Sequence, residues 1–364
     1  MTRVRAAVLR EFGEPLVIED VDLRDPLPEE VRVEIDAVAI CHSDITYIDG
    51  GWGGPLPSVY GHEAAGRVVE IGELVRDVAV GDRVVVTLIR SCGECRACRR
   101  GRPVACSSKP DPGSPIADAN GAIVGQGMFC GAFAEQVVVH HSQLAPIDLD
   151  ATPASLLACG VITGTGAVLR SAHVEPGDRV VVIGCGGVGL NVVQGARIAG
   201  AEVIVAVDPD SSKLEAALTF GATHCVDPTQ NDSVAFVRDA CSGDLADAVF
   251  VATGAPSAYR SATDFVGVGG SLVAVGMPAD ELSLGWDPGS LAAADQRIIG
   301  SKMGSAHPRR DIGELVELHR AGELMLDELI SATYPLERIN EAIADAKNGS
   351  ARRNVVVFDR KESS

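Results

Sequence analysis

The chain is short of positive charge and contains no long uninterrupted run of apolar residues. Its 364 residues include 31 Lys and Arg against 50 Asp and Glu, which gives a formal net charge of −19. A protein that binds nucleic acid or an anionic membrane needs a basic face, so this balance argues against both kinds of partner. An acidic surface that keeps the protein in solution is the simpler interpretation.

Signals for export and for membrane insertion are lacking as well. No run reaches the roughly 18 apolar residues of a membrane-spanning helix, and residues 1–15 lack the apolar core of a signal peptide. We therefore expect a cytoplasmic protein. Its 10 cysteines would then lie in a reducing compartment, where they indicate metal binding or catalysis rather than disulfide bonds.

The pattern of apolar residues changes along the chain, and its length is that of two domains. Up to about residue 150, short strand-like segments joined by turns predict a small barrel or sandwich. These segments are residues 3–9, 31–40, 64–71 and 83–88. Residues 107–132 are rich in Gly, Pro, Ser and Asp, and we expect them to form a loop.

Strands and helices alternate from about residue 160 onward, which predicts a parallel sheet covered on both faces. Strands are predicted at 179–183, 203–207, 248–252 and 271–276, and helices at 190–199, 213–220 and 256–265. Helices at 311–321 and 336–347 and a strand at 354–358 should pack back on the first domain. We thus expect one domain of residues 1–160 completed by 302–364, and a second of residues 161–301.

A glycine-rich turn joins the first strand of the second domain to its helix. Gly184, Gly186 and Gly189 form the pattern Gly-x-Gly-x-x-Gly. The first glycine permits the turn, the second lets the backbone approach a pyrophosphate, and the third lets helix and strand pack closely. Asp208 ends the next strand, where a carboxylate binds the ribose hydroxyls and repels a 2′-phosphate, and Asp210 adds negative charge. The motif predicts an NAD site; a glycine-rich turn without a ligand is the alternative.

Four cysteines follow one another closely in the first domain. Cys92, Cys95, Cys98 and Cys106 are spaced so that four thiolates can surround one ion. A set of four thiolates leaves no open coordination position, so we predict a structural zinc in a lobe at about residues 90–107. An iron–sulfur cluster is disfavoured, because no Pro follows the last Cys and the last spacing is too long.

A second possible metal site is spread over three segments. Cys41 and His62 are two candidate ligands, and Cys159, just before the second domain, is a third. Two thiolates and one imidazole would leave a fourth position open to water or substrate, as Lewis-acid catalysis requires. Taken singly, each has an ordinary explanation, because a lone buried Cys usually packs in a core and a lone His usually makes a hydrogen bond there.

With these motifs in this order, the chain resembles the zinc-dependent alcohol dehydrogenases of the medium-chain dehydrogenase/reductase superfamily. The segment Gly61-His-Glu-Ala-Ala-Gly66, the four-Cys lobe, Cys159 and the glycine-rich turn carry the resemblance, which covers essentially the whole length. It implies an α/β fold, with a GroES-like β-rich catalytic domain and a Rossmann domain built on a doubly wound parallel sheet. It also implies hydride transfer between an alcohol or aldehyde and NAD(H), two zinc ions per subunit, and a homo-oligomer, dimer or tetramer.

The resemblance further implies roles for individual residues. Cys41, His62 and Cys159 would bind the catalytic zinc, and Glu63 would be a carboxylate able to approach it. Asp44 would orient His62, and Ser43 would pass on the proton of the substrate hydroxyl. The implied cofactor contacts are His42, Thr163, Gly184, Gly186, Gly187, Val188, Gly189, Asp208, Lys213 and Arg353. His42 and Arg353 are among them as contacts to the pyrophosphate.

Departures from the family pattern leave some alternatives open. Thr46 stands where well-known members have a His, so the exit of the proton beyond Ser43 is not assigned. Trp52 and Leu88 fall at pocket-lining positions and suggest an apolar substrate. The four-Cys lobe also resembles that of mycothiol- or other thiol-dependent formaldehyde dehydrogenases and nitrosothiol reductases. A member that keeps its cofactor bound is another alternative. A non-catalytic NAD-binding protein is disfavoured, because every implied zinc ligand is present.

Overall fold

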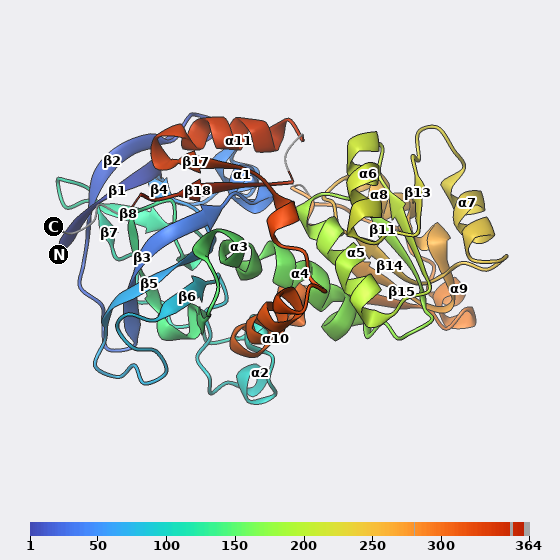
Figure 1. Ribbon diagram of the computed structural model, residues 1–364, viewed down its shortest axis with the longest axis horizontal. Helices are drawn as coiled ribbons and strands as arrows, with labels where there is room; N and C mark the ends of the chain where they lie inside the picture. Colours follow the sequence, from blue (N-terminus) through green and yellow to red (C-terminus); the bar gives the residue numbers. More distant parts are fainter. Residues whose placement is uncertain (280, 350–351, 360–364) are drawn as a thin grey trace. The chain divides into compact units, whose positions relative to one another are not determined.

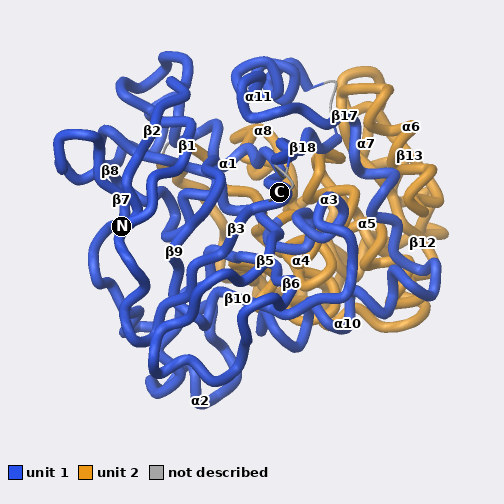
Figure 2. The backbone as a smooth tube through the Cα atoms, turned by 60° about the vertical axis from the view of Figure 1, so that its left-hand side comes forward, with its two compact units in different colours: residues 1–159, 307–364 blue, residues 160–306 orange. Residues whose placement is uncertain are grey.

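The computed structural model describes residues 1–279, 281–349 and 352–359. Its chain divides into two compact units: Met1–Cys159 with His307–Ser364 forms unit 1, and Gly160–Ala306 forms unit 2 (Figure 2). The C-terminal segment returns to unit 1 because β18 (Arg353–Val357) pairs in antiparallel fashion with β3 (Glu30–Ala39).

Unit 1 is built mainly from β-strands (Figure 1). A closed barrel contains, in order, β1 (Thr2–Leu9), β2 (Val17–Leu23), β7 (Ile116–Ala117), β8 (Ile123–Gln126) and β4 (Ser58–Val59). A 7-stranded sheet contains, in order, β10 (Leu144–Pro146), β6 (Arg83–Val86), β5 (Glu63–Ile71), β3, β18 and β17 (Ile330–Pro335), and β9 (Gln136–His140) pairs with β3. One apolar core unites barrel and sheet, since residues of both belong to a single buried cluster.

The helices of unit 1 have between 4 and 13 residues. They are α1 (His42–Ile48), α2 (Arg96–Arg99), α3 (Ala151–Ser155), α10 (Pro308–Arg320) and α11 (Ile339–Lys347). The 3₁₀ turns are η1 (Pro103–Ala105), η2 (Gly127–Phe129), η3 (His141–Gln143), η4 (Leu156–Ala158), η8 (Asp327–Leu329) and η9 (Leu336–Arg338).

The expectation of a loop over residues 107–132 is wrong in part, because β7, β8 and η2 lie within that segment. β7 has 2 residues and β8 has 4, which is too short for an alternating pattern to emerge from the sequence. These strands nevertheless complete the barrel, since β7 pairs with β2 and β8 pairs with β4.

Unit 2 contains a 6-stranded sheet in which neighbouring strands are parallel. Its order is β13 (His224–Val226), β12 (Val203–Val207), β11 (Arg179–Ile183), β14 (Ala246–Val251), β15 (Val266–Ala274) and β16 (Arg297–Gly300). Counted along the chain, this is the order 3-2-1-4-5-6 of a doubly wound Rossmann sheet. The prediction of an α/β fold with such a sheet and a β-rich second part is confirmed.

Helices lie before, between and after the parallel strands of unit 2 along the chain. They are α4 (Gly160–Gly166), the π-helix η5 (Ala167–Ala172), α5 (Gly187–Ala199), α6 (Ser211–Phe220), α7 (Ser233–Ala240), α8 (Pro256–Ser261), η6 (Ala262–Phe265), α9 (Pro288–Ala293) and η7 (Met303–Ser305). Four elements of unit 2 were not expected from the sequence, namely β13, α7, α9 and β16, which have between 3 and 8 residues and are partly exposed.

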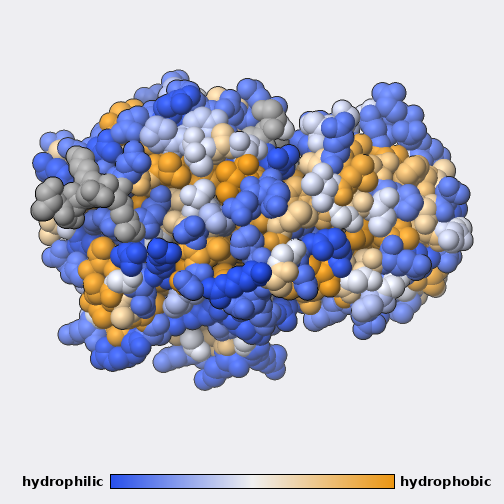
Figure 3. Space-filling view, in the orientation of Figure 1, coloured by the Kyte–Doolittle hydropathy of each residue, from blue (hydrophilic) through white to orange (hydrophobic). Residues whose placement is uncertain are grey.

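No single helix among the described residues is long and apolar enough to cross a membrane; segments 151–158 and 160–172 meet that criterion only when taken together. On the face drawn in Figure 3, hydrophilic residues cover much of the surface and hydrophobic residues are exposed in patches between them.

Candidate zinc and coenzyme sites

Four side chains of unit 1 meet in a buried cluster formed by Cys41, His62, Glu63 and Cys159. One potential ligand atom of each residue lies within 4.8 Å of the others. Cys41 is the residue before α1, Glu63 begins β5, and Cys159 follows η4. The fold therefore brings together the three residues expected as ligands and the carboxylate expected beside them.

Asp44 is fully buried and joins the segments of this cluster. Its Oδ1 accepts a hydrogen bond from Gly61 N at 2.9 Å and lies 3.0 Å from Nδ1 of His62. Its Oδ2 accepts from Cys41 N at 3.2 Å. These contacts fix the imidazole ring through one nitrogen, as carboxylates commonly do for metal-binding histidines.

The other imidazole nitrogen of His62 is available for a ligand. Nε2 is buried and has no hydrogen-bond partner in the part of the chain that the structure describes. A buried polar atom without a partner costs free energy, so the arrangement favours a bound group at Nε2. Two thiol groups and one imidazole form a donor set that zinc prefers, and the cluster fits a zinc ion on this chemistry.

A glycine is required immediately before His62. Gly61 has φ of +93°, a value that residues with a Cβ rarely adopt. A Cβ at this position would also lie 2.7 Å from the backbone nitrogen of Phe133. The first glycine of the segment Gly61–Gly66 thus serves to place His62 in the cluster.

Arg353 places a positive charge beside the Glu63 carboxyl group of the cluster. Its Nη1 lies 3.6 Å from Oε1 of Glu63, and both side chains are buried. Burial raises the pKa of Glu63 to about 8, although Arg353 opposes the shift. The Cys159 thiol and then His62 hold the pKa of Cys41 well below its ordinary value, while burial opposes them. Cys41 is thereby favoured as a thiolate, the form that binds metal.

The pairing of Glu63 with Arg353 was not expected from the sequence. The two residues come from distant parts of the chain, and only the pairing of β18 with β3 brings them close. No local sequence signal could have revealed it. Nη2 of Arg353 is buried and without a hydrogen-bond partner among the described residues.

Helix α1 carries the residues expected to handle the proton and the pyrophosphate. His42 is exposed at its first position, and Ser43 is half-buried at its second. The hydroxyl of Thr46 donates to the carbonyl oxygen of His42 at 2.9 Å, so it is engaged by its own helix.

Aromatic side chains gather at the end of the same helix. The ring of Tyr47 stacks on Tyr60 at 5.4 Å and meets Trp52 edge-on at 5.1 Å. Leu88, like Tyr47, packs half-buried against the core of unit 1. Of the two residues expected to line an apolar pocket, Trp52 thus contacts an aromatic ring and Leu88 packs against the apolar core.

The four cysteines of the lobe converge as their spacing suggested. Sγ–Sγ distances are 3.6 Å for Cys95–Cys98, 3.6 Å for Cys92–Cys106 and 3.9 Å for Cys95–Cys106. A tetrahedral site with bonds of about 2.3 Å has sulfur–sulfur edges of about 3.8 Å. Hydrogen bonds from the backbone, first that of Cys98 and then that of Ser107, lower the pKa of Cys95 to about 5. The lobe therefore fits a zinc ion bound by four thiolates.

The glycine-rich turn of unit 2 lies between β11 and α5. A Cβ on Gly189 would lie 1.8 Å from the carbonyl oxygen of Gly184, so helix and turn are packed too closely for any side chain. A Cβ on Gly186 would meet no atom within 4 Å, which leaves this side of the turn open to a ligand. The pattern is that of a turn able to receive a pyrophosphate.

Asp208 follows β12 and is held beside this turn. Its Oδ2 accepts from Cys185 N at 2.8 Å, and its Oδ1 accepts from Asp210 N at 3.0 Å. The other expected cofactor contacts of unit 2 are distributed as Thr163 on α4, Gly187 and Val188 on the first turn of α5, and Lys213 on α6. The hydroxyl of Thr163 lies 3.5 Å from Sδ of Met303.

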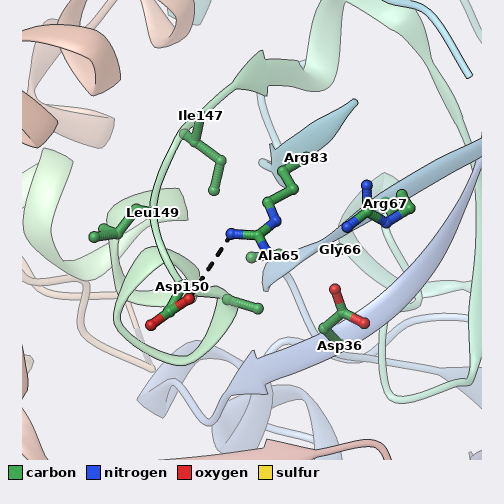
Figure 4. Close-up of a pocket in the computed structure, with 9 residues that line it drawn as sticks. Asp36, Ala65, Gly66, Arg67, Arg83, Ile147, Leu149 and Asp150 are labelled. Carbon is green, nitrogen blue, oxygen red and sulfur yellow. Dashed lines mark ion pairs between the residues drawn. The ribbon is translucent and has the colours of Figure 1, made fainter. Parts of the chain in front are cut away.

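A separate pocket in unit 1 contains none of these residues (Figure 4). Its volume is about 220 Å³, and it is lined by Asp36, Ala65, Gly66, Arg67, Arg83, Ile147, Leu149, Asp150 and Ala151. Arg83 and Asp150 form an exposed ion pair of 3.8 Å there, which contributes little to stability. The pocket is distinct from the candidate zinc site.

Comparisons with known proteins identify the family. A family model described as alcohol dehydrogenase GroES-like domain matches residues 27–149, and one described as zinc-binding dehydrogenase matches residues 187–320. "Putative alcohol dehydrogenase D" of Mycobacterium tuberculosis is 37% identical over 369 residues, covering 98% of this chain and 100% of the relative. "NDMA-dependent alcohol dehydrogenase" of Amycolatopsis methanolica is 34% identical, covering 98% of this chain and 99% of the relative. The crystal structure of benzyl alcohol dehydrogenase from Acinetobacter calcoaceticus is similar with a TM-score of 0.92 and 30% identity, covering 99% of this chain and 100% of that chain.

Proposed function

Since the chain belongs to the zinc-dependent alcohol dehydrogenases of the medium-chain dehydrogenase/reductase superfamily, we propose that it transfers a hydride between an alcohol or aldehyde and NAD(H). The observation that carries the proposal is the buried cluster of Cys41, His62 and Cys159, with Asp44 fixing the imidazole from behind. The substrate would be a small molecule with an apolar body, as Trp52 suggests.

Zinc bound by this cluster would supply a Lewis acid that polarises the substrate oxygen. The chain's own residues do the rest. Asp44 holds the ring of His62 in one orientation, and Ser43 accepts the proton of the substrate hydroxyl. Because the hydroxyl of Thr46 already donates within α1, we infer that the proton leaves Ser43 through solvent.

The coenzyme half of the proposal rests on the glycine-rich turn. The open space at Gly186 and the start of α5 would receive the pyrophosphate, and Asp208 would bind the ribose hydroxyls and disfavour NADP. The buried Nη2 of Arg353 has no hydrogen-bond partner among the described residues, which supports a contact between Arg353 and the same pyrophosphate. His42, exposed on α1, would be the second cation.

The four-Cys lobe would hold a second, structural zinc, so we propose two zinc ions per subunit. Its sulfur–sulfur distances of 3.6–3.9 Å support this assignment. The subunit is proposed to act as a homo-oligomer, either a dimer or a tetramer.

A substrate screen tests the function. The zinc-loaded protein is mixed with NAD⁺ and simple, aromatic and allylic alcohols, and with formaldehyde in the presence and absence of mycothiol or glutathione. NADH formation from an alcohol without added thiol supports the proposal. Turnover only with a thiol would instead indicate a thiol-dependent formaldehyde dehydrogenase. No turnover with any compound, with or without NDMA, would favour a non-catalytic NAD-binding protein.

The A. methanolica relative is described as NDMA-dependent, and this favours a second candidate function. In this second candidate, the same alcohol oxidation reduces a nicotinamide cofactor that stays bound. An external compound such as NDMA then reoxidises the bound cofactor, so exchange with free NAD⁺ is not needed. The discriminating measurement is the coenzyme released on denaturing the purified protein. Bound nicotinamide together with NDMA-dependent turnover in the absence of added NAD⁺ would support this candidate over the first.

A further inference from the structure

Three further side chains with metal-binding groups meet at the end of β9. A carboxylate oxygen of Glu29 and one ring nitrogen each of His140 and His141 lie within 4.8 Å of one another. None of them belongs to the two candidate zinc sites, and the proposed function does not use them. Glu29 is exposed, His140 is buried and His141 is half-buried, so the group opens to solvent on one side.

The backbone holds the three residues together. β3 and β9 are antiparallel with Glu30 opposite His140, and the amide of His141 donates to the carbonyl oxygen of Glu29 at 3.0 Å. The amide of Leu74, in the loop after β5, donates to the carbonyl oxygen of Pro28 at 2.8 Å and so ties that loop to the turn before β3. The positions of the three Cα atoms are therefore set by sheet pairing and do not depend on the side chains.

His141 is oriented in the way that metal-binding histidines usually are. Its Nδ1 lies 2.9 Å from Oδ2 of Asp77. Asp77 also pairs with Arg309, which donates to the carbonyl oxygen of His141 at 3.2 Å. A carboxylate bound to one imidazole nitrogen fixes the tautomer and directs the other nitrogen, Nε2, to a metal.

His140 is fixed by Ser142. Its Nδ1 lies 2.8 Å from the hydroxyl oxygen of Ser142 and 3.2 Å from the amide nitrogen of the same residue. The amide can donate to a bare Nδ1, and the hydroxyl can accept from a protonated one. Binding of a metal at Nε2 therefore selects the tautomer in which Nδ1–H donates to the Ser142 hydroxyl, and the Ser142 amide then gives up its bond to Nδ1.

Glu29 lies slightly too far from His140 for both to bind one metal ion, and its side chain can move closer. Oε2 of Glu29 lies 3.9 Å from Nε2 of His140, beyond a hydrogen bond. A tetrahedral site with bonds of about 2.1 Å needs donor–donor edges of about 3.4 Å. The Glu29 side chain is 58% exposed and can move by that amount, whereas the His140 side chain, 6% exposed, stays in place.

We propose that Glu29, His140 and His141 form a third metal site, which binds a divalent transition-metal ion of the zinc or nickel class reversibly. Imidazole nitrogens with one carboxylate suit such ions, whereas magnesium and calcium prefer oxygen ligands throughout. Three protein ligands leave at least one position to water, so the ion should exchange more readily than one bound by four thiolates.

The test is a metal titration of the purified zinc-containing protein. Calorimetric titrations use Zn²⁺, Ni²⁺ and Mg²⁺ separately, and zinc is counted by mass spectrometry before and after. We expect one saturable equivalent of Zn²⁺ and of Ni²⁺ beyond the zinc already retained, and none of Mg²⁺. Glu29→Gln, at an exposed position, should keep the fold and weaken this binding at least about tenfold, as should His141→Ala.

Matched variants sharpen the result. Asp77→Asn should weaken binding about tenfold by releasing the ring of His141. His224→Ala removes a half-buried histidine of unit 2 whose Nδ1 contacts Thr223 and should bind the extra ion as the unaltered protein does. The proposal is overturned if no extra equivalent binds, or if Glu29→Gln and His141→Ala bind it as tightly as His224→Ala.

Discussion

Asp44→Asn is expected to weaken zinc retention and kcat/KM about tenfold to a hundredfold while the protein still folds. The reason is the arrangement of its hydrogen bonds. Oδ1 receives Gly61 N and faces His62 Nδ1, while Oδ2 receives Cys41 N. An asparagine with its oxygen in the Oδ1 position keeps the contacts to Gly61 and His62 but lacks the negative charge that makes the imidazole a stronger ligand, and it turns an amide N–H toward the donor of Cys41.

The size of the effect decides which substitution is useful. One buried donor left without an acceptor costs about 1–3 kcal/mol, which most proteins survive because their stability is about 5–15 kcal/mol. Asp44→Ala would leave three such donors and therefore cost about 3–9 kcal/mol on the same scale. Its loss of activity could then reflect unfolding, so Asp44→Asn is the informative variant.

The assay compares the unaltered protein, Asp44→Asn and a control variant. It measures thermal unfolding, kcat/KM and the rate at which a chelator removes zinc from each protein. Asp49→Asn is the matched control, because Asp49 ends the same helix and pairs with Lys347 at the surface. It should change all three readings little. Asp44→Asn with kcat/KM within about twofold of the unaltered protein and unchanged chelator resistance would refute the role of the Asp44 carboxylate at the zinc site.

Three further predictions concern the two proposed zinc ions and the proposed coenzyme. Cys159→Ala should abolish turnover and remove one zinc with the fold intact, whereas Cys95→Ala should chiefly lower the unfolding temperature; metal analysis with thermal scans would expose reversed assignments. Asp208→Asn should raise the kcat/KM ratio of NADP to NAD by at least about tenfold, equivalent to about 1.4 kcal/mol, and an unchanged ratio would contradict its role at the ribose. Gly186→Val should fold and lose NAD binding, because its side chain would fill the open space beside the turn. Gly189→Ala should instead destabilise unit 2, because its Cβ would lie 1.8 Å from a carbonyl oxygen. Fluorescence titration with NAD and thermal unfolding measurements separate the two effects.

Features carried by neighbouring residues were predictable from the sequence. The four cysteines of the lobe lie within one short segment, so their convergence needed no knowledge of the fold. The glycine-rich turn likewise needs only the strand before it and the helix after it, and the parallel sheet follows from alternating strands and helices.

Features that depend on long-range pairing were not predictable in the same way. Glu63 meets Arg353 only because β18 returns to β3, and the cluster at Glu29 and His140 depends on the register of β3 with β9. β7 and β8 were missed because a strand of 2 or 4 residues cannot display a period. Cys159 was placed beside Cys41 through family resemblance and an argument about coordination, since nothing in the local sequence links the two.

The most direct test of the central claim follows the hydride itself. The zinc-loaded protein is given NAD⁺ and an alcohol that carries deuterium on its carbinol carbon, and the reduced coenzyme is weighed by mass spectrometry. We predict NADH that has gained one deuterium, with the activity lost in Cys159→Ala. Failure of any alcohol to reduce NAD⁺, or NADH that carries no deuterium, would contradict the proposed hydride transfer.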